Sequence, residues 1–129
     1  MREALVNALA VGSGGFLGAL ARYGMSGWVQ RLAPMSTFPY GTLAVNLAGC
    51  FGIGVLAGLA EARQLFGPEV RAFALIGLLG GFTTFSTFGY ETWAMVREAD
   101  YLRAAANVGG HVLFGVLLVG MGYVLTSSR

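Results

Sequence analysis

The chain has 129 residues, of which 56% are hydrophobic and 11% are charged, and its mean hydropathy is +0.69. Soluble domains usually contain about 25% charged residues, so this composition excludes an ordinary water-soluble protein. Eight arginines and six acidic residues give a net charge of +2, and the basic residues form no cluster that would bind nucleic acid.

Four long stretches without a charged residue divide the chain. They contain 18, 29, 19 and 25 residues, at positions 4–21, 32–60, 72–90 and 104–128. A helix needs about 20 residues to cross the hydrocarbon core of a bilayer. The sequence therefore predicts an all-α membrane protein with a single transmembrane domain over residues 1–129. The four helices are expected at about residues 4–28, 40–60, 72–97 and 102–126.

The first predicted helix superficially resembles a secretory signal peptide, because Arg2 precedes an apolar run. We expect no cleavage, since the run is long and the acidic Glu3 lies in the region that should be basic. Gly14 and Gly18 are four residues apart, a spacing that lets another helix approach closely. Arg22 lies near the end of the span. It either extends its head group to water, attracts anions at a vestibule, or donates to a neighbouring helix.

The second predicted helix carries Thr42, Asn46 and Gly49 on one face, since they are spaced at i, i+4 and i+7. An amide at membrane depth needs hydrogen-bond partners. Asn46 therefore either bonds a neighbouring helix or donates its N–H to an anion in a pore. Cys50 is the only cysteine, which excludes a disulfide framework, and we interpret it as a small apolar helix residue.

The third predicted helix contains an unusual run at residues 80–88, which reads GGFTTFSTF. Two glycines lower helix propensity and give the backbone access to positive φ, and the threonines add β-branched stiffness. We therefore predict a break in the helix at residues 80–87. Backbone groups freed at membrane depth must be satisfied by protein, by an ion or by water. Channels and transporters commonly place an ion site at such a break.

Aromatic rings and hydroxyls alternate in the same run. Phe85 and Phe88 are interleaved with Ser86 and Thr87, and the positive edge of an aromatic ring can bind a small anion without a buried formal charge. Glu91 follows Phe88 by about one helical turn. We expect its carboxylate to face water at a pore mouth or at the membrane interface.

The fourth predicted helix places Asn107, His111 and Gly115 on one face, because they are spaced by four. His111 is the only histidine and has no cysteine or acidic residue near it in the sequence, which argues against a metal site. A hydrogen-bonding or pore-lining role, a packing role and, less favoured, a titrating pH sensor are open for it.

The arginines are almost evenly divided between the two sides of a four-helix topology. One side carries four, Arg2, Arg63, Arg71 and Arg129. The other carries three, Arg31, Arg97 and Arg103, with Arg22 just inside it. The positive-inside rule therefore gives no firm orientation. Because the chain could insert both ways and four helices are few for a pathway, we predict an antiparallel two-fold homodimer.

Three motifs resemble the Fluc fluoride channels, also called the CrcB family: residues 15–23 (GFLGALARY), 41–46 (GTLAVN) and 80–88 (GGFTTFSTF). The resemblance covers nearly the whole chain. It implies a dual-topology homodimer in a bacterial plasma or inner membrane, with two antiparallel pores for passive fluoride export. It also implies a structural sodium ion at the dimer centre, bound by the backbone carbonyls of Gly80 and Thr83.

The resemblance further implies roles for individual side chains. Arg22 matches an arginine near the end of the family's first helix. From its position in the span, Glu91 is expected, like Arg22, to have a vestibule or structural role. The fourth helix departs from the family pattern of a tyrosine followed four residues later by a serine, since it has Asn107 and His111. The expected pore residues are Thr42, Asn46, Phe85, Ser86, Thr87, Phe88, Asn107 and His111.

Two other classes of protein share some of these features. A small multidrug-resistance transporter also has four spans and dual topology, but it needs an acidic residue within the first helix, and none lies between Glu3 and Arg22. A non-conducting packing subunit of a larger membrane complex would explain the glycines but not the run of rings and hydroxyls. No nucleotide-binding motif or catalytic triad is present, so we expect no enzyme activity.

Overall fold

The computed structural model describes residues 1–64 and 66–127, and none of these residues forms a strand. Within these ranges, four helical spans are long and apolar enough to cross a membrane: Arg2–Leu32, Tyr40–Arg63, Pro68–Arg97 and Tyr101–Ser127. The all-α fold with four such spans is therefore confirmed. Each span is longer than predicted at one or both ends, because polar residues continue the helices beyond the apolar stretches.

The first two spans are continuous helices, α1 (Arg2–Leu32) and α2 (Tyr40–Arg63). The third span consists of α3 (Pro68–Arg71), η1 (Ala72–Leu79), α4 (Gly80–Phe82) and α5 (Phe85–Arg97). The fourth span consists of α6 (Tyr101–Gly109), η2 (Gly110–Phe114) and α7 (Gly115–Ser127). The segments η1 and η2 are π-helical, a conformation that is rare and frequently found at functional sites.

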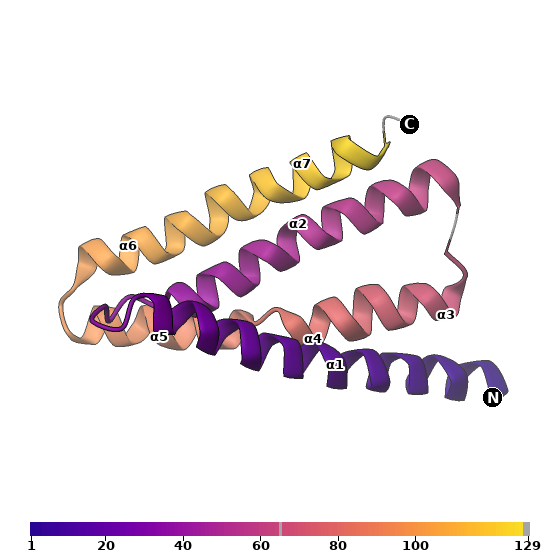
Figure 1. Ribbon diagram of the computed structural model, residues 1–129, viewed down its shortest axis with the longest axis horizontal. Coiled ribbons are helices and arrows are strands. Elements are labelled where there is room, and N and C mark those ends of the chain that lie inside the picture. Colours follow the sequence, from indigo (N-terminus) through magenta and orange to yellow (C-terminus); the bar gives the residue numbers. More distant parts are fainter. Residues whose placement is uncertain (65, 128–129) are drawn as a thin grey trace.

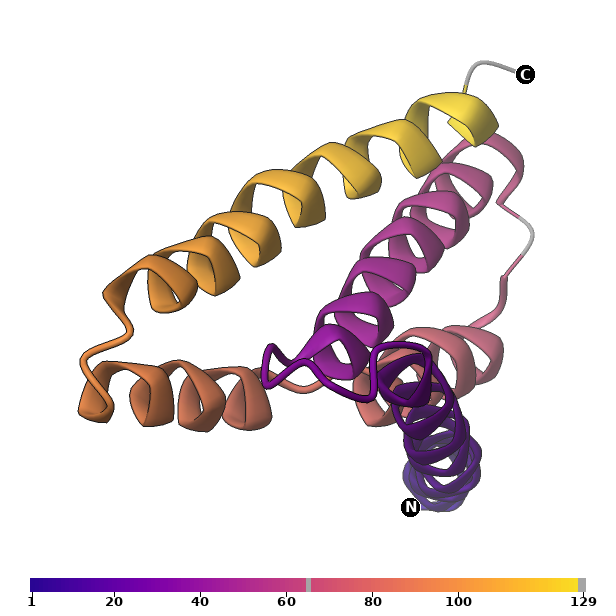
Figure 2. The same ribbon diagram turned by 60° about the vertical axis from the view of Figure 1, so that its left-hand side comes forward.

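Two pairs of neighbouring spans make up the fold (Figure 1). Helix α2 lies along α7, and α1 lies along η1 and α4. The start of α1, the end of α7, the end of α2 and the start of α3 lie at one end of the molecule, on the right in Figure 1. The α1–α2 and α5–α6 connections lie at the opposite end, and Figure 2 shows α5 leading to the connection with α6 there.

Glycines bring the helices of each pair into backbone contact. A Cβ atom on Gly14 would lie 2.3 Å from the carbonyl oxygen of Phe73, and one on Gly18 would lie 2.1 Å from that of Leu78. The close approach predicted from the spacing of Gly14 and Gly18 is confirmed, with η1 as the neighbour. In the second pair, a Cβ atom on Gly54 of α2 would lie 2.2 Å from an α7 backbone oxygen.

The interior of a single chain is small. Val45 is the only large apolar side chain that is fully buried among the described residues, whereas many large apolar side chains on all four spans are exposed. An apolar surface of this extent is typical of a chain whose solvent is lipid or another protein chain.

The third span breaks between α4 and α5, as predicted, but the break is shorter than residues 80–87. Only Thr83 (φ −89°, ψ 159°) and Thr84 (φ −150°, ψ 114°) have extended backbones. Gly80 is helical (φ −62°, ψ −40°), and none of the described glycines has a positive φ. The expectation that the glycine pair supplies an unusual backbone conformation was wrong. Gly81 instead allows close packing, since a Cβ atom there would lie 2.5 Å from the carbonyl oxygen of Gly15.

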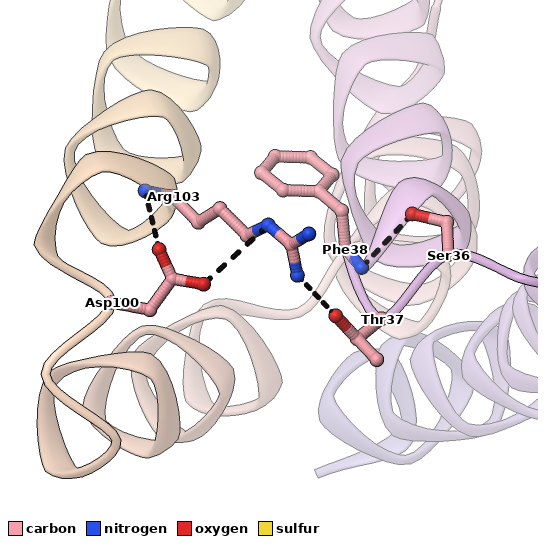
Figure 3. A network of polar contacts seen from close by, with 5 residues as sticks. All are labelled: Ser36, Thr37, Phe38, Asp100 and Arg103. Carbon is pink, nitrogen blue, oxygen red and sulfur yellow. Dashed lines mark hydrogen bonds and ion pairs between the residues drawn. The ribbon is translucent and has the colours of Figure 1, made fainter.

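A polar network closes the end of the molecule that holds the α1–α2 and α5–α6 connections (Figure 3). Asp100 caps α6, since its Oδ1 accepts from the Arg103 backbone N–H at 3.3 Å and its Oδ2 pairs with Arg103 Nε at 3.4 Å. Arg103 Nη1 also donates to Thr37 Oγ1, and the Phe38 N–H donates to Ser36 Oγ at 3.2 Å. Exposed ion pairs of this kind contribute at most about 1 kcal/mol, so the network mainly fixes the two connections relative to each other.

Candidate functional site

Asn46 of α2 joins the helix break through two hydrogen bonds to one residue. Its Oδ1 accepts from the Thr84 backbone N–H at 2.8 Å, and its Nδ2 donates to the Thr84 carbonyl oxygen at 3.0 Å. Both Thr84 backbone groups are thereby satisfied by a side chain in place of a continuing helix. Asn46 thus bonds a neighbouring span, and its donation to an anion in a pore stays a prediction. We call this pair of bonds the Asn46 clamp.

His111 of η2 lies directly against the Asn46 clamp. Its Nε2 is 3.1 Å from Asn46 Nδ2, and its Nδ1 is 2.9 Å from the carbonyl oxygen of Asn107. The imidazole is also tilted against the ring of Phe88, with centroids 4.3 Å apart, and the ring of Phe88 contacts that of Phe85 at 5.4 Å. The rings of Phe85, Phe88 and His111 therefore form a continuous row beside the break.

Thr84 also determines where α5 begins. Its Oγ1 accepts from the Thr87 backbone N–H at 3.2 Å, which is the side-chain N-cap expected for a threonine at a helix start. The same hydroxyl donates to Thr87 Oγ1 at 3.0 Å and lies 3.4 Å from Ser86 Oγ. The hydroxyls of Thr84, Ser86 and Thr87 thus form one connected group at the first turn of α5. The sequence had given Thr84 no separate role, although a threonine before a helix start is a recognisable cap signal.

Two cavities meet at the break. The first, of about 430 Å³, is mostly apolar and is lined by the ring row, by Asn46 and by Gly80 and Thr83. The second, of about 470 Å³, is lined by Arg22, Thr42 and Thr87 among others. Thr84 lines both cavities. The first cavity thus holds four of the expected pore residues and the second holds two, Thr42 and Thr87, whereas Ser86 and Asn107 line neither.

Glu91 is half-buried and turns toward α2. Its Oε1 accepts from Thr42 Oγ1 at 2.7 Å, and its Oε2 is buried without a hydrogen-bond partner in the described part of the chain. This differs from the expectation that the carboxylate faces water. The sequence could not show this contact, because Thr42 and Glu91 lie on different helices and are 49 positions apart.

Asn107 is fully buried and lies behind His111. Its Nδ2 donates to Thr92 Oγ1 at 2.9 Å, and Thr92 in turn donates to the Phe88 carbonyl oxygen at 2.8 Å. Asn107 lines neither of the two cavities and supports Thr92 and the start of η2 from behind, and its place in a pore wall stays a prediction. Thr92 is a supporting residue that sequence reasoning missed, and its only signal was its place one turn after Phe88.

The break frees two carbonyl oxygens that were predicted to bind a cation. In a continuous helix the Gly80 oxygen would accept from the Thr84 N–H, and the Thr83 oxygen from the Thr87 N–H. Both of these N–H groups donate to side chains instead, one to Asn46 and the other to Thr84. Such oxygens suit a hard cation. The described residues contain no group of three or more His, Cys, Asp or Glu side chains that could bind a metal.

Comparison with known proteins identifies the family. The chain matches the family described as "CrcB-like protein, Camphor Resistance (CrcB)" over residues 9–123. It belongs to the CrcB family. The match includes the helix break, both cavities and every candidate site residue described above.

Several relatives are similar over most of their length. "Fluoride-specific ion channel FluC 1" of Methanosarcina acetivorans is 42% identical over 116 residues, which cover 90% of this chain and 87% of the relative. "Fluoride-specific ion channel FluC" of Nitratidesulfovibrio vulgaris is 44% identical over 112 residues, covering 87% and 90%. The protein of the same name from Chloroflexus aurantiacus is 43% identical over 117 residues, covering 90% and 91%.

These similarities confirm the resemblance that the three sequence motifs indicated. The relatives are named as ion channels rather than as enzymes, in agreement with the expectation that this CrcB-family chain is not an enzyme. Together with the four apolar spans, they show that the chain is a multi-pass membrane protein.

Proposed function

We propose that this chain is a fluoride-selective passive channel that protects the cell by exporting fluoride down its electrochemical gradient. The observation that carries this proposal is the similarity to proteins named fluoride-specific ion channels over 87% to 90% of the chain. The structure adds a helix break at which aromatic rings and hydroxyls adjoin two cavities. Neither a multidrug transporter nor a packing subunit is supported by a comparable observation.

The proposed pathway replaces the hydration of fluoride with several weak, neutral interactions. Fluoride is small and strongly hydrated, and conduction requires sites that bind well enough to admit the ion and weakly enough to release it. Ring edges of Phe85 and Phe88 and hydroxyls of Ser86 and Thr87 supply such interactions. Asn46 acts mainly through the Asn46 clamp, which holds the backbone at the pathway, because its amide group already has three hydrogen-bond partners.

We further propose that two copies assemble as an antiparallel, dual-topology homodimer with two pores. In the single chain, Phe85 is 83% exposed and Gly80 is exposed, although both line the first cavity. A second copy covering this face would enclose the cavity and bury the ring of Phe85. If antiparallel assembly is correct, a few lysines added to the α2–α3 connection should fix one orientation and lower activity. An oppositely biased copy should restore it.

A sodium ion at the two-fold axis fits the freed backbone oxygens. The carbonyl groups of Gly80 and Thr83 from two copies would supply four oxygen donors, and bound sodium would compensate the dipoles that converge there. The residues of this chain would orient those oxygens through the Asn46 clamp and the Thr84 cap, which divert the N–H groups that would otherwise occupy them.

Fluoride efflux from liposomes that contain only this purified chain tests the proposed function. The liposomes are loaded with potassium fluoride, and a potassium ionophore removes the electrical barrier to net efflux. We expect rapid efflux of fluoride and little efflux of chloride in the matched experiment. Efflux no faster than from protein-free liposomes, with the protein shown to be inserted, would refute the proposed channel.

A further inference from the structure

The two ring nitrogens of His111 have partners that determine its protonation. Nδ1 lies 2.9 Å from the carbonyl oxygen of Asn107, and a carbonyl oxygen can only accept, so Nδ1 carries a hydrogen. In the neutral ring Nε2 is then an acceptor. Opposite it, at 3.1 Å, lies Asn46 Nδ2, which can only donate.

The orientation of the Asn46 amide is fixed independently of the histidine. Its oxygen must face the Thr84 N–H and its nitrogen must face the Thr84 carbonyl oxygen. In the reversed amide, the NH₂ group would face the Thr84 N–H and the amide oxygen would face the Thr84 carbonyl oxygen, and neither pair could form a hydrogen bond. The nitrogen therefore has one hydrogen for Thr84 and a second for His111. The carbonyl of Asn107, the ring of His111, the amide of Asn46 and the backbone of Thr84 form one chain of bonds with a single consistent direction.

We infer that His111 is a positioning residue, whose neutral, Nδ1-protonated ring holds the Asn46 clamp in place through Nε2. This inference rests on the proposed channel function and goes beyond it, because it assigns the residue at which the fourth helix departs from the family pattern. The ring also packs against Phe88 at a centroid distance of 4.3 Å. His111 thus orients both the clamp at the break and one ring of the ring row.

Protonation of His111 would oppose both functions. A hydrogen on Nε2 would face the hydrogens of Asn46 Nδ2, so that the bond between them is lost. The positive charge would lie beside the first cavity, where a fixed charge binds an anion tightly and slows its release. Fluoride flux should therefore fall as His111 becomes protonated.

One titratable side chain of the neighbouring helices shares the cavity with His111, and several others have partners of their own. On α2, Cys50 lines the same cavity, and on α5, Glu91 accepts from Thr42. Arg103 of α6 pairs with Asp100, and on α7 the Tyr123 hydroxyl donates to Glu61. Within residues 1–64 and 66–127, the polar partners of the imidazole are those of Asn46 and Asn107.

The tautomer can be measured directly, because His111 is the only histidine in the chain. Protein labelled with nitrogen-15 histidine and reconstituted in lipid would give NMR signals that need no assignment. We expect a protonated Nδ1 and an unprotonated Nε2 at neutral pH. A ring protonated on Nε2, either alone or on both nitrogens, would overturn the inference. This measurement does not require fluoride flux, so it stands even if the proposed channel function fails.

Three substitutions separate positioning from packing. His111→Gln keeps an uncharged side chain with an acceptor oxygen, His111→Leu removes the acceptor, and Leu113→Gln is a control at an exposed position of the same π-helical segment. We expect H111L to lower fluoride efflux by about tenfold, the effect of losing one net hydrogen bond. Efflux through H111Q should be well above efflux through H111L, and efflux through L113Q should equal that of the wild type. Equal losses in H111Q and H111L would show that the ring acts only through packing.

The pH profile of efflux is the final readout, with the leak of protein-free liposomes subtracted at each pH. Wild-type flux should fall with the same midpoint as the NMR titration of the ring, and H111Q flux should stay flat over that range. The inference would be refuted if wild-type flux stayed constant over the pH range in which the ring titrates, or if wild-type and H111Q flux fell together over that range. If H111Q does not fold, the coincidence of the two wild-type midpoints still decides the question.

Discussion

Replacing Asn46 by leucine would remove the side chain that satisfies the helix break. Asn46 is buried, with 9% of its surface exposed, and it makes two hydrogen bonds to the Thr84 backbone and one to His111. In Asn46→Leu, the N–H and C=O of Thr84 would lose their partners in an apolar environment. Each buried, unpaired backbone group costs about 1–3 kcal/mol, so we expect the free energy of unfolding to fall by about 2–6 kcal/mol.

Equilibrium unfolding in mixed detergent micelles measures this loss. Asn7→Leu is the matched control, because Asn7 Oδ1 is buried without a partner in the described part of the chain. Removing an unpaired polar atom leaves no orphaned partner, so the control should change stability by less than about 1 kcal/mol. The reasoning would be refuted if the Asn46 and Asn7 variants unfold with the same free energy.

Three further predictions concern the rings, the glycines and the cation. Phe85→Ile and Phe88→Ile keep apolar bulk but remove the positive ring edge, so fluoride efflux should fall steeply in both; unchanged efflux would reduce the rings to packing. Gly81→Ala should lower the thermal stability of the fold far more than Gly80→Ala. A Cβ atom at Gly81 would lie 2.5 Å from a backbone oxygen of α1, whereas one at Gly80 would lie 4.0 Å from its nearest neighbour. Exchange of sodium for a large organic cation should weaken the dimer, as measured by its dissociation in detergent, but fluoride flux should not depend on a sodium gradient. A dimer whose stability is unchanged after prolonged dialysis against sodium-free buffer would exclude a structural sodium ion.

The spans and the position of the break could be predicted because both depend on local composition. Long intervals between charged residues indicate the helices, and the glycine and threonine content of residues 80–88 indicates the break. The close approach at Gly14 and Gly18 was also predictable from spacing, since small residues one turn apart form a flat helix face. Which helix fills that face is a tertiary property, and the structure identifies it as η1.

Hydrogen-bond partners across helices could not be predicted. The Asn46 clamp joins residues 38 positions apart, and the contact between Asn46 and His111 joins residues 65 positions apart. Periodicity places each side chain on a face of its own helix but gives no rotation of one helix relative to another. The inward turn of Glu91, which differed from expectation, and the burial of Asn107 both depend on that rotation.

The break itself shows why the glycine argument named the wrong residue. Gly80 is an ordinary helical residue, and the extended backbone begins only at Thr83. Before the break, the Leu79 carbonyl oxygen accepts from both the backbone N–H and the hydroxyl of Thr83, each at 3.0 Å. After it, the Thr84 side chain caps α5.

Gly49 of α2 leaves room for this arrangement, since a Cβ atom on Gly49 would lie 2.2 Å from Thr83 Cγ2. The break is thus stabilised by partners on neighbouring helices rather than by glycine flexibility. A break of this kind keeps a defined geometry, because both backbone groups of Thr84 and the N–H of Thr87 are bound by specific side chains. Defined geometry is what a pathway requires if its rings and hydroxyls are to replace the hydration shell of an ion at fixed positions.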